Sequence, residues 1–322
     1  MRAVRYEREG SAAEVLTIGE IDRPAPGPGQ VLVRVEVSGI NPSDVKTRAG
    51  LTPRPIDGFQ IPHMDGAGEI VEVGPGVPAD RVGQRVWLWL AAFGSRWGTA
   101  AEYTVLDATQ AVPLPGSGTA ELGACLGIPA LTAHQCLFSH GPLDGRRVLV
   151  HGGAGAVGHF AIELARWAGA DVVATASTED KAAQASAAGA SAVVDYRSPE
   201  AAEAIRKEGP IDLVVDVAVA TNWDLDVAVL RPGGAIVAYA TDGKPLQIPV
   251  RPAMIANLRL TFFLLYTHPR AALERAAASI SQAIGEGALT PLPVTSFGLA
   301  DAVAAHEAVE SGTPGKVLLD LR

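Results

Sequence analysis

Cysteine is scarce in this chain. The 322 residues include two cysteines, Cys125 and Cys136. Two thiolates are too few for a four-cysteine metal site, and a chain of this length does not depend on a disulfide framework for its core. The sequence therefore argues against a cysteine-built zinc lobe and against a disulfide-stapled domain.

Long apolar runs and basic runs are also absent. No stretch approaches the roughly 18 apolar residues that a membrane-spanning helix needs. The N-terminal segment MRAVRYEREG contains no apolar signal core. The net charge is −9, and lysine and arginine never gather into the basic block that marks a nucleic-acid surface. We therefore expect a cytoplasmic protein that binds neither membrane nor nucleic acid.

Apolar residues, by contrast, are plentiful. Hydrophobic residues make up 48% of the chain and charged residues 19%, which supports a large core, and the length suits about two domains. Alternation over residues 31–37, with similar runs at 69–73 and 86–90, predicts half-buried strands. Gly/Pro clusters at 24–29 and 74–76 predict turns between them. The first third of the chain therefore indicates a small β barrel or sandwich.

The pattern changes after about residue 120. Apolar runs at 148–151, 171–176, 193–194, 213–215 and 235–239 alternate with alanine-rich helical stretches. Between the first two runs, apolar residues from Val157 to Ala168 recur on one helical face. Strands that alternate with helices predict an α/β fold with a parallel sheet.

A glycine-rich turn joins the first of these strands to its helix. Gly152, Gly155 and Gly158 enclose Ala156 and Val157 in a G-x-x-G-x-x-G spacing. Glycines let the backbone turn sharply and approach a pyrophosphate, and the helix that follows offers unpaired N–H groups to the phosphates. A glycine triplet alone is weak evidence, but its place between a strand and a helix favours dinucleotide binding over a turn that only packs.

The end of the second strand favours NADP(H) over NAD(H). An NAD site usually places a carboxylate there to bind the ribose 2′-OH. In this chain Ser177 stands at that position, and the first acid is Glu179. Lys181 follows, and Tyr196 comes after the third strand. A hydroxyl and an ammonium suit a 2′-phosphate, although a single lysine is often only a solvated helix residue.

Four motifs together resemble one family. They are 38–44 (SGINPSD), 127–133 (GIPALTA), 151–158 (HGGAGAVG) and 315–317 (GKV). In this order they are similar to the quinone oxidoreductases related to zeta-crystallin, in the medium-chain dehydrogenase/reductase superfamily. The resemblance implies a GroES-like β-rich catalytic domain at 1–121 and 267–322, and a doubly wound Rossmann NADP-binding domain at 122–266. It also implies a homodimer, for which the run 258–266 is a candidate sheet edge, with an internal strand as the alternative.

The superfamily also contains zinc alcohol dehydrogenases. Alignment by motif places the usual zinc ligands on Asn41, Met64 and Ile128, and residues 87–101 contain no cysteine. Zinc needs Cys, His or carboxylate ligands. The resemblance therefore implies a member without a metal.

Candidate catalytic residues follow from the same resemblance. Asn41 could donate to an oxyanion or orient the cofactor, or could serve the turn before Pro42. Asp44 could lie in the cleft or act as a helix cap. Lys46 stands where many relatives carry a tyrosine, so it is a candidate proton donor, with a solvated lysine as the alternative.

Further cofactor-binding candidates come from the motifs and from the strand ends. Thr132 lies in the segment that approaches the nicotinamide in relatives, and Tyr239 ends a strand at the edge where such sheets bind ligands. Phe263 and Leu265 could line the nicotinamide pocket or the dimer seam. Lys316 of the GKV motif completes the set.

The function implied is hydride transfer from NADPH to a quinone or an α,β-unsaturated carbonyl. A conjugated acceptor delocalises the developing oxyanion and needs less Lewis-acid help than an alcohol. One alternative is an enoyl thioester reductase or a tailoring reductase of secondary metabolism. Another, of a different class, is an NADPH-binding structural or sensor protein with little catalysis.

Overall fold

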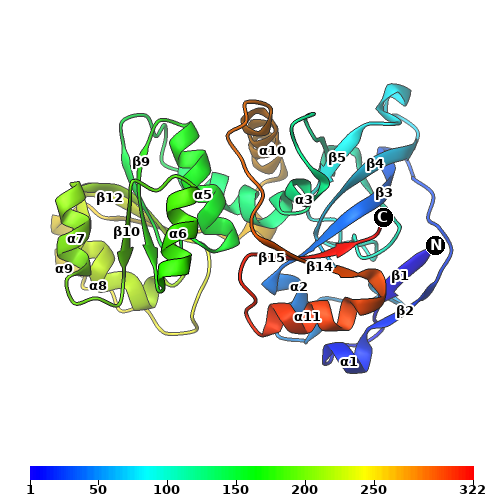
Figure 1. The fold of residues 1–322 in the computed structure, drawn as a ribbon, viewed down its shortest axis with the longest axis horizontal. Helices are drawn as coiled ribbons and strands as arrows, with labels where there is room; N and C mark the ends of the chain where they lie inside the picture. Colours follow the sequence, from blue (N-terminus) through cyan, green and yellow to red (C-terminus); the bar gives the residue numbers. More distant parts are fainter. The chain divides into compact units, whose positions relative to one another are not determined.

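The computed structural model describes residues 1–322 and divides the chain into two compact units, Met1–Ile128 with Ala277–Arg322, and Pro129–Ala276 (Figure 1). The domain limits expected from the resemblance stay a prediction. The second unit ends inside α10 (Arg270–Gly285). No helix of the structure is both long enough and apolar enough to cross a membrane.

The first unit is built around a seven-stranded, mostly antiparallel sheet. Its order is β14-β15-β3-β4-β5-β7, and β6 also pairs with β3. The strands are β3 (Gln30–Ile40), β4 (Asp65–Val73), β5 (Arg85–Leu88), β6 (Tyr103–Asp107), β7 (Ala111–Pro113), β14 (Val294–Gly298) and β15 (Lys316–Asp320). The alternation at 31–37 falls in β3, where Val31 and Val33 are buried against Ile70 of β4.

A second, two-stranded sheet and four helices complete this unit. They are β1 (Arg2–Arg5), β2 (Thr17–Glu20), α1 (Ala12–Val15), α2 (Pro42–Arg48), α3 (Ala120–Gly123) and α11 (Ala302–Glu310). Helix α2 begins where β3 ends, because Asn41 and Asp44 form a reciprocal capping box and Pro42 occupies the first helical position. The last strand of the chain, β15, pairs antiparallel with β3, so Val317 lies opposite Ile40.

The second unit is a six-stranded parallel sheet in the order β10-β9-β8-β11-β12-β13. The strands are β8 (Arg147–Val150), β9 (Asp171–Ala176), β10 (Ala192–Asp195), β11 (Ile211–Asp216), β12 (Leu230–Ala238) and β13 (Arg259–Phe262). The helices are α4 (Leu131–Phe138), α5 (Ala156–Trp167), α6 (Glu179–Ala187), α7 (Ala201–Glu208), α8 (Val219–Val229) and α9 (Val250–Ile255). This order is that of a doubly wound dinucleotide fold. The predicted parallel sheet is confirmed.

Two features of this sheet matter for function. The chain's direction across the sheet reverses between β8 and β11, and ligands of such sheets bind at the carboxyl ends of the strands near this point. The apolar run 258–266 contains β13, whose one neighbour is β12. The run is therefore at a sheet edge, and the alternative of an internal strand is excluded.

Candidate functional site

The glycine-rich turn stands at the end of β8, in the middle of the second unit's sheet. Gly152 has a φ of +68°, a conformation that favours glycine. Its carbonyl accepts a hydrogen bond from the Gly155 amide at 2.9 Å. A Cβ on Gly158 would lie 2.2 Å from the same carbonyl oxygen, so Gly158 lets α5 pack directly on the turn. The first N–H groups of α5, including those of Ala156 and Val157, lack helical acceptors and can bind phosphate.

Several predicted cofactor residues follow the carboxyl ends of neighbouring strands. Ser177 follows β9, Tyr196 follows β10, Tyr239 follows β12 and Phe263 follows β13. Parallel strands end at one edge of the sheet, so these residues and the glycine-rich turn share that edge. The structure thus brings together residues that the sequence spreads over more than a hundred positions.

Two basic side chains, Lys181 and Arg197, lie near the ends of β9 and β10, together with the acids Glu179, Asp180 and Asp195. Lys181 is exposed in the first turn of α6, and Thr178 caps that helix by accepting from the Lys181 amide. Arg197, which is ion-paired with Asp195, donates to the Ser177 carbonyl. Sequence reasoning placed no role on Arg197. Its position directly after Tyr196 was the available signal.

Thr132 and Leu265 lie apart from these strand ends. Thr132 is buried in α4, which packs against α5. Leu265 is 4% exposed and belongs to a short turn after β13. No hydrogen bond or ion pair connects either of them to the residues above.

The first unit holds a buried cluster of four polar side chains. The Lys316 ammonium donates to Asn41 Oδ1 at 2.6 Å and to Asp65 Oδ2 at 3.0 Å. The Asn41 amide donates to Asp65 Oδ2 at 2.8 Å and, more weakly, to Asp44 Oδ2 at 3.3 Å. All four side chains are nearly inaccessible to solvent. The cluster thus engages both the oxygen and the nitrogen of the Asn41 side-chain amide.

Burial changes the acidity of the two carboxyls. It raises the pKa of Asp44 to about 7, assisted by the nearby negative charge of Asp65 and opposed by the Asn41 backbone amide. Burial also raises the pKa of Asp65, although the Lys316 ammonium counteracts it. Asp44 therefore holds a proton up to near-neutral pH, while Asp65 is the partner that faces the ammonium.

Asp44 also lines a small hollow in the same unit. Met64 and Ala92 contribute apolar surface to it, and Tyr6 and Arg54 contribute polar groups. Lys46, two residues further along α2, is exposed, and its side chain makes no hydrogen bond or ion pair. The structure therefore joins Asn41, Asp44 and Lys316, and leaves Lys46 apart.

Sequence reasoning missed several members of these networks. Asp65 directly follows Met64, one of the positions where zinc-dependent relatives carry a metal ligand. His63 is fully buried, bonded to Ser38 at 2.8 Å and to His306 at 2.9 Å. Its φ of +78° marks a special backbone position, and nothing in the local sequence predicted its partner on α11.

The cluster does not suit a zinc ion. At the three positions where the resemblance places zinc ligands stand an amide bonded to Lys316, a thioether and an aliphatic side chain: Asn41, Met64 and Ile128. The Lys316 ammonium already contributes a positive charge at Asn41 and Asp65. A second cation there would meet electrostatic repulsion and too few donors.

Comparison with known proteins agrees with this architecture. The alcohol dehydrogenase GroES-like domain family matches residues 27–116, and the zinc-binding dehydrogenase family matches residues 156–282. The quinone oxidoreductase of Lama guanicoe is 30% identical over 330 residues, covering 100% of this chain and 98% of that protein.

Solved structures give the same result. A mycobacterial quinone oxidoreductase matches with a TM-score of 0.86 and 30% identity, covering 100% of both chains. A mycobacterial protein complexed with NADPH matches with a TM-score of 0.84, also at 30% identity and full coverage of both chains. The chain is a member of the medium-chain dehydrogenase/reductase superfamily, with a GroES-like and a Rossmann domain. Within that superfamily it belongs to the quinone oxidoreductase family.

Proposed function

We propose that this chain is an NADPH-dependent oxidoreductase that reduces a quinone or an α,β-unsaturated carbonyl without zinc. The observation that carries the proposal is the Lys316 ammonium, bonded to Asn41 and Asp65 where zinc-dependent relatives would place a metal. A fixed ammonium cannot activate an alcohol as a Lewis acid does. The chemistry left to the site is reduction of an acceptor that is already activated by conjugation.

The cofactor proposal rests on the second unit. The turn at Gly152–Gly158 would hold the pyrophosphate through backbone amides. Ser177, Lys181 and Arg197 would bind the 2′-phosphate, since all are near the end of β9 and none is an acid. The similarity to a protein complexed with NADPH supports this assignment. Tyr239 and Phe263, at the ends of β12 and β13, would face the nicotinamide half.

Residues of the first unit would supply the proton that the reaction needs. Bound NADPH supplies a hydride, and reduction of a quinone or enone then needs one proton to complete the product. Asp44 lines the hollow described above and keeps its proton up to about pH 7. It is therefore our candidate donor, with Asn41 and Lys316 fixing its surroundings. Our proposal leaves Lys46 out, because its ammonium is exposed and unconnected to the cluster.

The decisive experiment is an acceptor panel. We expect NADPH oxidation with quinones or enones, much weaker oxidation of NADH, and no stoichiometric zinc in the purified protein. Activity confined to enoyl thioesters would favour the thioester reductase instead. Tight NADPH binding with no turnover of any acceptor would favour a structural or sensor protein.

The role of Asp44 has its own readout. We expect kcat to fall above about pH 7, because the donor form of Asp44 is lost there. Asp44→Asn keeps the helix cap but cannot donate a proton, so kcat should drop about 100-fold or more with a flat pH profile. A normal kcat in Asp44→Asn would refute this role.

We also propose a homodimer through the edge strand β13. Exposed apolar side chains stand at the end of this strand and just after it, with Phe262 68% and Leu264 54% exposed. An open, apolar strand edge favours pairing with a second copy. Phe262→Glu should yield monomers in analytical ultracentrifugation, whereas Leu51→Glu, at a 73% exposed apolar site of the first unit, should not. A monomeric wild-type protein would refute the proposal.

A further inference from the structure

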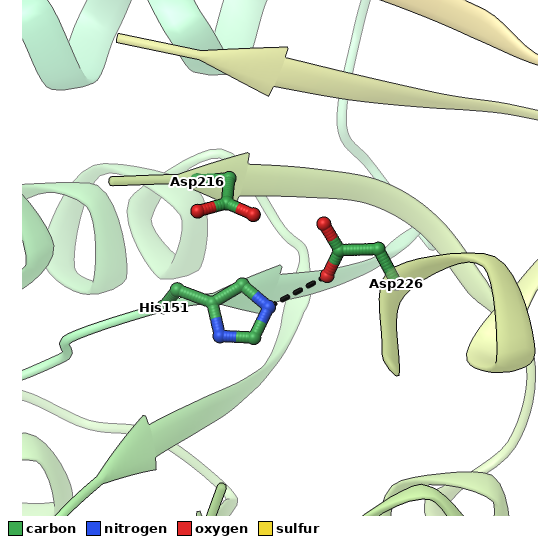
Figure 2. Close-up of side chains that lie close together, drawn as sticks. All are labelled: His151, Asp216 and Asp226. Carbon is green, nitrogen blue, oxygen red and sulfur yellow. Dashed lines mark hydrogen bonds and ion pairs between the residues drawn. The ribbon is translucent and has the colours of Figure 1, made fainter. Parts of the chain in front are cut away.

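A chain of buried hydrogen bonds lies directly behind the glycine-rich turn. His151 connects β8 to Gly152, and its Nε2 lies 2.7 Å from Asp226 Oδ1 of α8 (Figure 2). Its Nδ1 lies 3.0 Å from Thr175 Oγ1 of β9. The same hydroxyl oxygen accepts a hydrogen bond from the Gly152 amide at 3.2 Å. The side chains of His151, Thr175 and Asp226 are at most 2% exposed.

The hydrogen atoms of this chain can be assigned by elimination. The Gly152 amide can only donate, so Thr175 Oγ1 is its acceptor. The threonine hydrogen then has one partner within reach, which is His151 Nδ1. The imidazole therefore carries its hydrogen on Nε2 and donates it to Asp226. This arrangement gives the Gly152 amide, the Thr175 hydroxyl and His151 Nε2–H one acceptor each, and it leaves Asp226 Oδ2 without a partner.

A second carboxyl group stands beside the first. Asp216, at the end of β11, accepts at Oδ1 from the Ala218 amide at 2.6 Å and from Asn222 Nδ2 at 2.9 Å. The Oδ2 atoms of Asp216 and Asp226 are both buried without a hydrogen-bond partner. Figure 2 shows the two carboxyl groups facing each other above the imidazole. Burial raises the pKa of Asp226 to about 8, and the negative charge of Asp216 assists this shift.

The same atoms exclude two other roles. Both nitrogens of His151 are occupied by Asp226 and Thr175, so the imidazole has no lone pair left for a metal ion. The order Asp226, His151, Thr175 resembles a hydrolytic triad. However, the Thr175 hydroxyl is fully buried and already accepts from Gly152, so no substrate carbonyl can reach it.

We propose that His151, held by Asp226, is a positioning residue for the pyrophosphate-binding turn. It fixes the Thr175 hydroxyl, and this hydroxyl fixes the Gly152 amide at the start of the turn. The Thr175 carbonyl accepts from the Gly153 amide at 3.0 Å, so one residue of β9 holds two consecutive amides of the turn. This inference rests on the proposed cofactor site and adds residues that would not touch the cofactor.

The test compares two ligands in matched variants. NADPH contains the pyrophosphate, whereas adenosine 2′-monophosphate lacks it and would reach only the ribose end of the site. Thr175→Val and His151→Phe keep the volume but remove the hydrogen bonds. We expect each to weaken NADPH binding about tenfold, with the dissociation constant of adenosine 2′-monophosphate unchanged. Calorimetry measures both constants.

Two conservative variants serve as controls. Thr175→Ser retains the hydroxyl. Asp226→Asn presents an oxygen to His151 and an N–H to Asp216, as a protonated Asp226 would. Both should bind NADPH within about twofold of the wild type, since no hydrogen bond is lost. Nitrogen-15 shifts of histidine in the unmodified protein should show His151 as the neutral Nε2–H tautomer, a reading that does not depend on any variant folding.

Several outcomes would overturn the inference. These are an Nδ1–H tautomer at His151, a stoichiometric metal lost in Asp226→Asn, equal losses for the two ligands, or unchanged NADPH affinity in folded Thr175→Val. Failure of the wild-type protein to bind NADPH would instead remove the proposed function. The two failures are therefore distinguishable.

Discussion

The ion pair between Lys316 and Asp65 provides the sharpest test of the first unit. The two side chains are 2% and 0% exposed, and their charged atoms lie 3.0 Å apart. Lys316→Met keeps most of the side-chain volume and removes the charge, which leaves the Asp65 carboxylate buried without a counter-ion. Breaking such a pair from one side costs about 3–5 kcal/mol. We expect a loss of this size in the free energy of unfolding at pH 7.5.

The loss should depend on pH in a definite direction. Without Lys316, burial raises the pKa of Asp65 further above its value in the unfolded chain, so the folded variant binds a proton that the unfolded chain releases. Stability of the variant, relative to wild type, therefore decreases as pH rises and recovers as pH falls. The recovery cannot exceed about 1.4 kcal/mol per pH unit for one proton. Comparison at pH 5.5 and 7.5 separates this effect from simple loss of packing.

Urea unfolding followed by tryptophan fluorescence measures the loss, because Trp87 and Trp89 are buried in the same unit. Arg34→Met is a matched control. Arg34 pairs with Glu69 at the same 3.0 Å distance on the same sheet, but these side chains are 51% and 34% exposed. Exposed pairs contribute about 0–1 kcal/mol. Equal losses in Lys316→Met and Arg34→Met would refute the reasoning, as would a pH-independent loss in Lys316→Met.

Three further predictions concern single residues. Burial lowers the pKa of His306 to about 3, so the stability of the wild type should fall as the pH drops below about 6.5. Urea unfolding at pH 6.5 and pH 5 measures this loss. The variant His306→Phe should make the loss about 2 kcal/mol smaller. Lys181→Ala should weaken NADPH binding about tenfold and leave NADH binding unchanged in fluorescence titrations; equal losses would count against a 2′-phosphate site. Gly158→Ala should abolish NADPH binding, because the new Cβ would lie 2.2 Å from the Gly152 oxygen; normal affinity would mean that this turn does not hold the cofactor.

Most of the strands and helices of the second unit could be predicted from local sequence patterns. The turn between β8 and α5 and the strands on either side of it are each encoded within a few consecutive residues. These features were predictable because they depend on short-range geometry and not on which distant segment they contact.

The networks that hold the sites were not predictable in the same way. Lys316 is 275 positions from Asn41, and His151 is 75 positions from Asp226. Lone histidines and aspartates carry no periodicity, and their partners are fixed by the order of strands in each sheet. Asn41 illustrates the limit, since its motif was visible but its amide proved to be engaged by Lys316 and Asp65.

The pairing of β15 with β3 also has a consequence during synthesis of the protein. The ribosome makes Asn41 and Asp65 long before Lys316, which is 275 and 251 positions further along the chain. Until that lysine emerges, the nascent first unit lacks both the strand that pairs with β3 and β14 and the counter-ion of a buried carboxylate. The second unit is contained in one continuous segment, so it can fold before β15 is synthesised. We therefore expect a chain that stops before β15 to retain a folded second unit and to have an incomplete first unit.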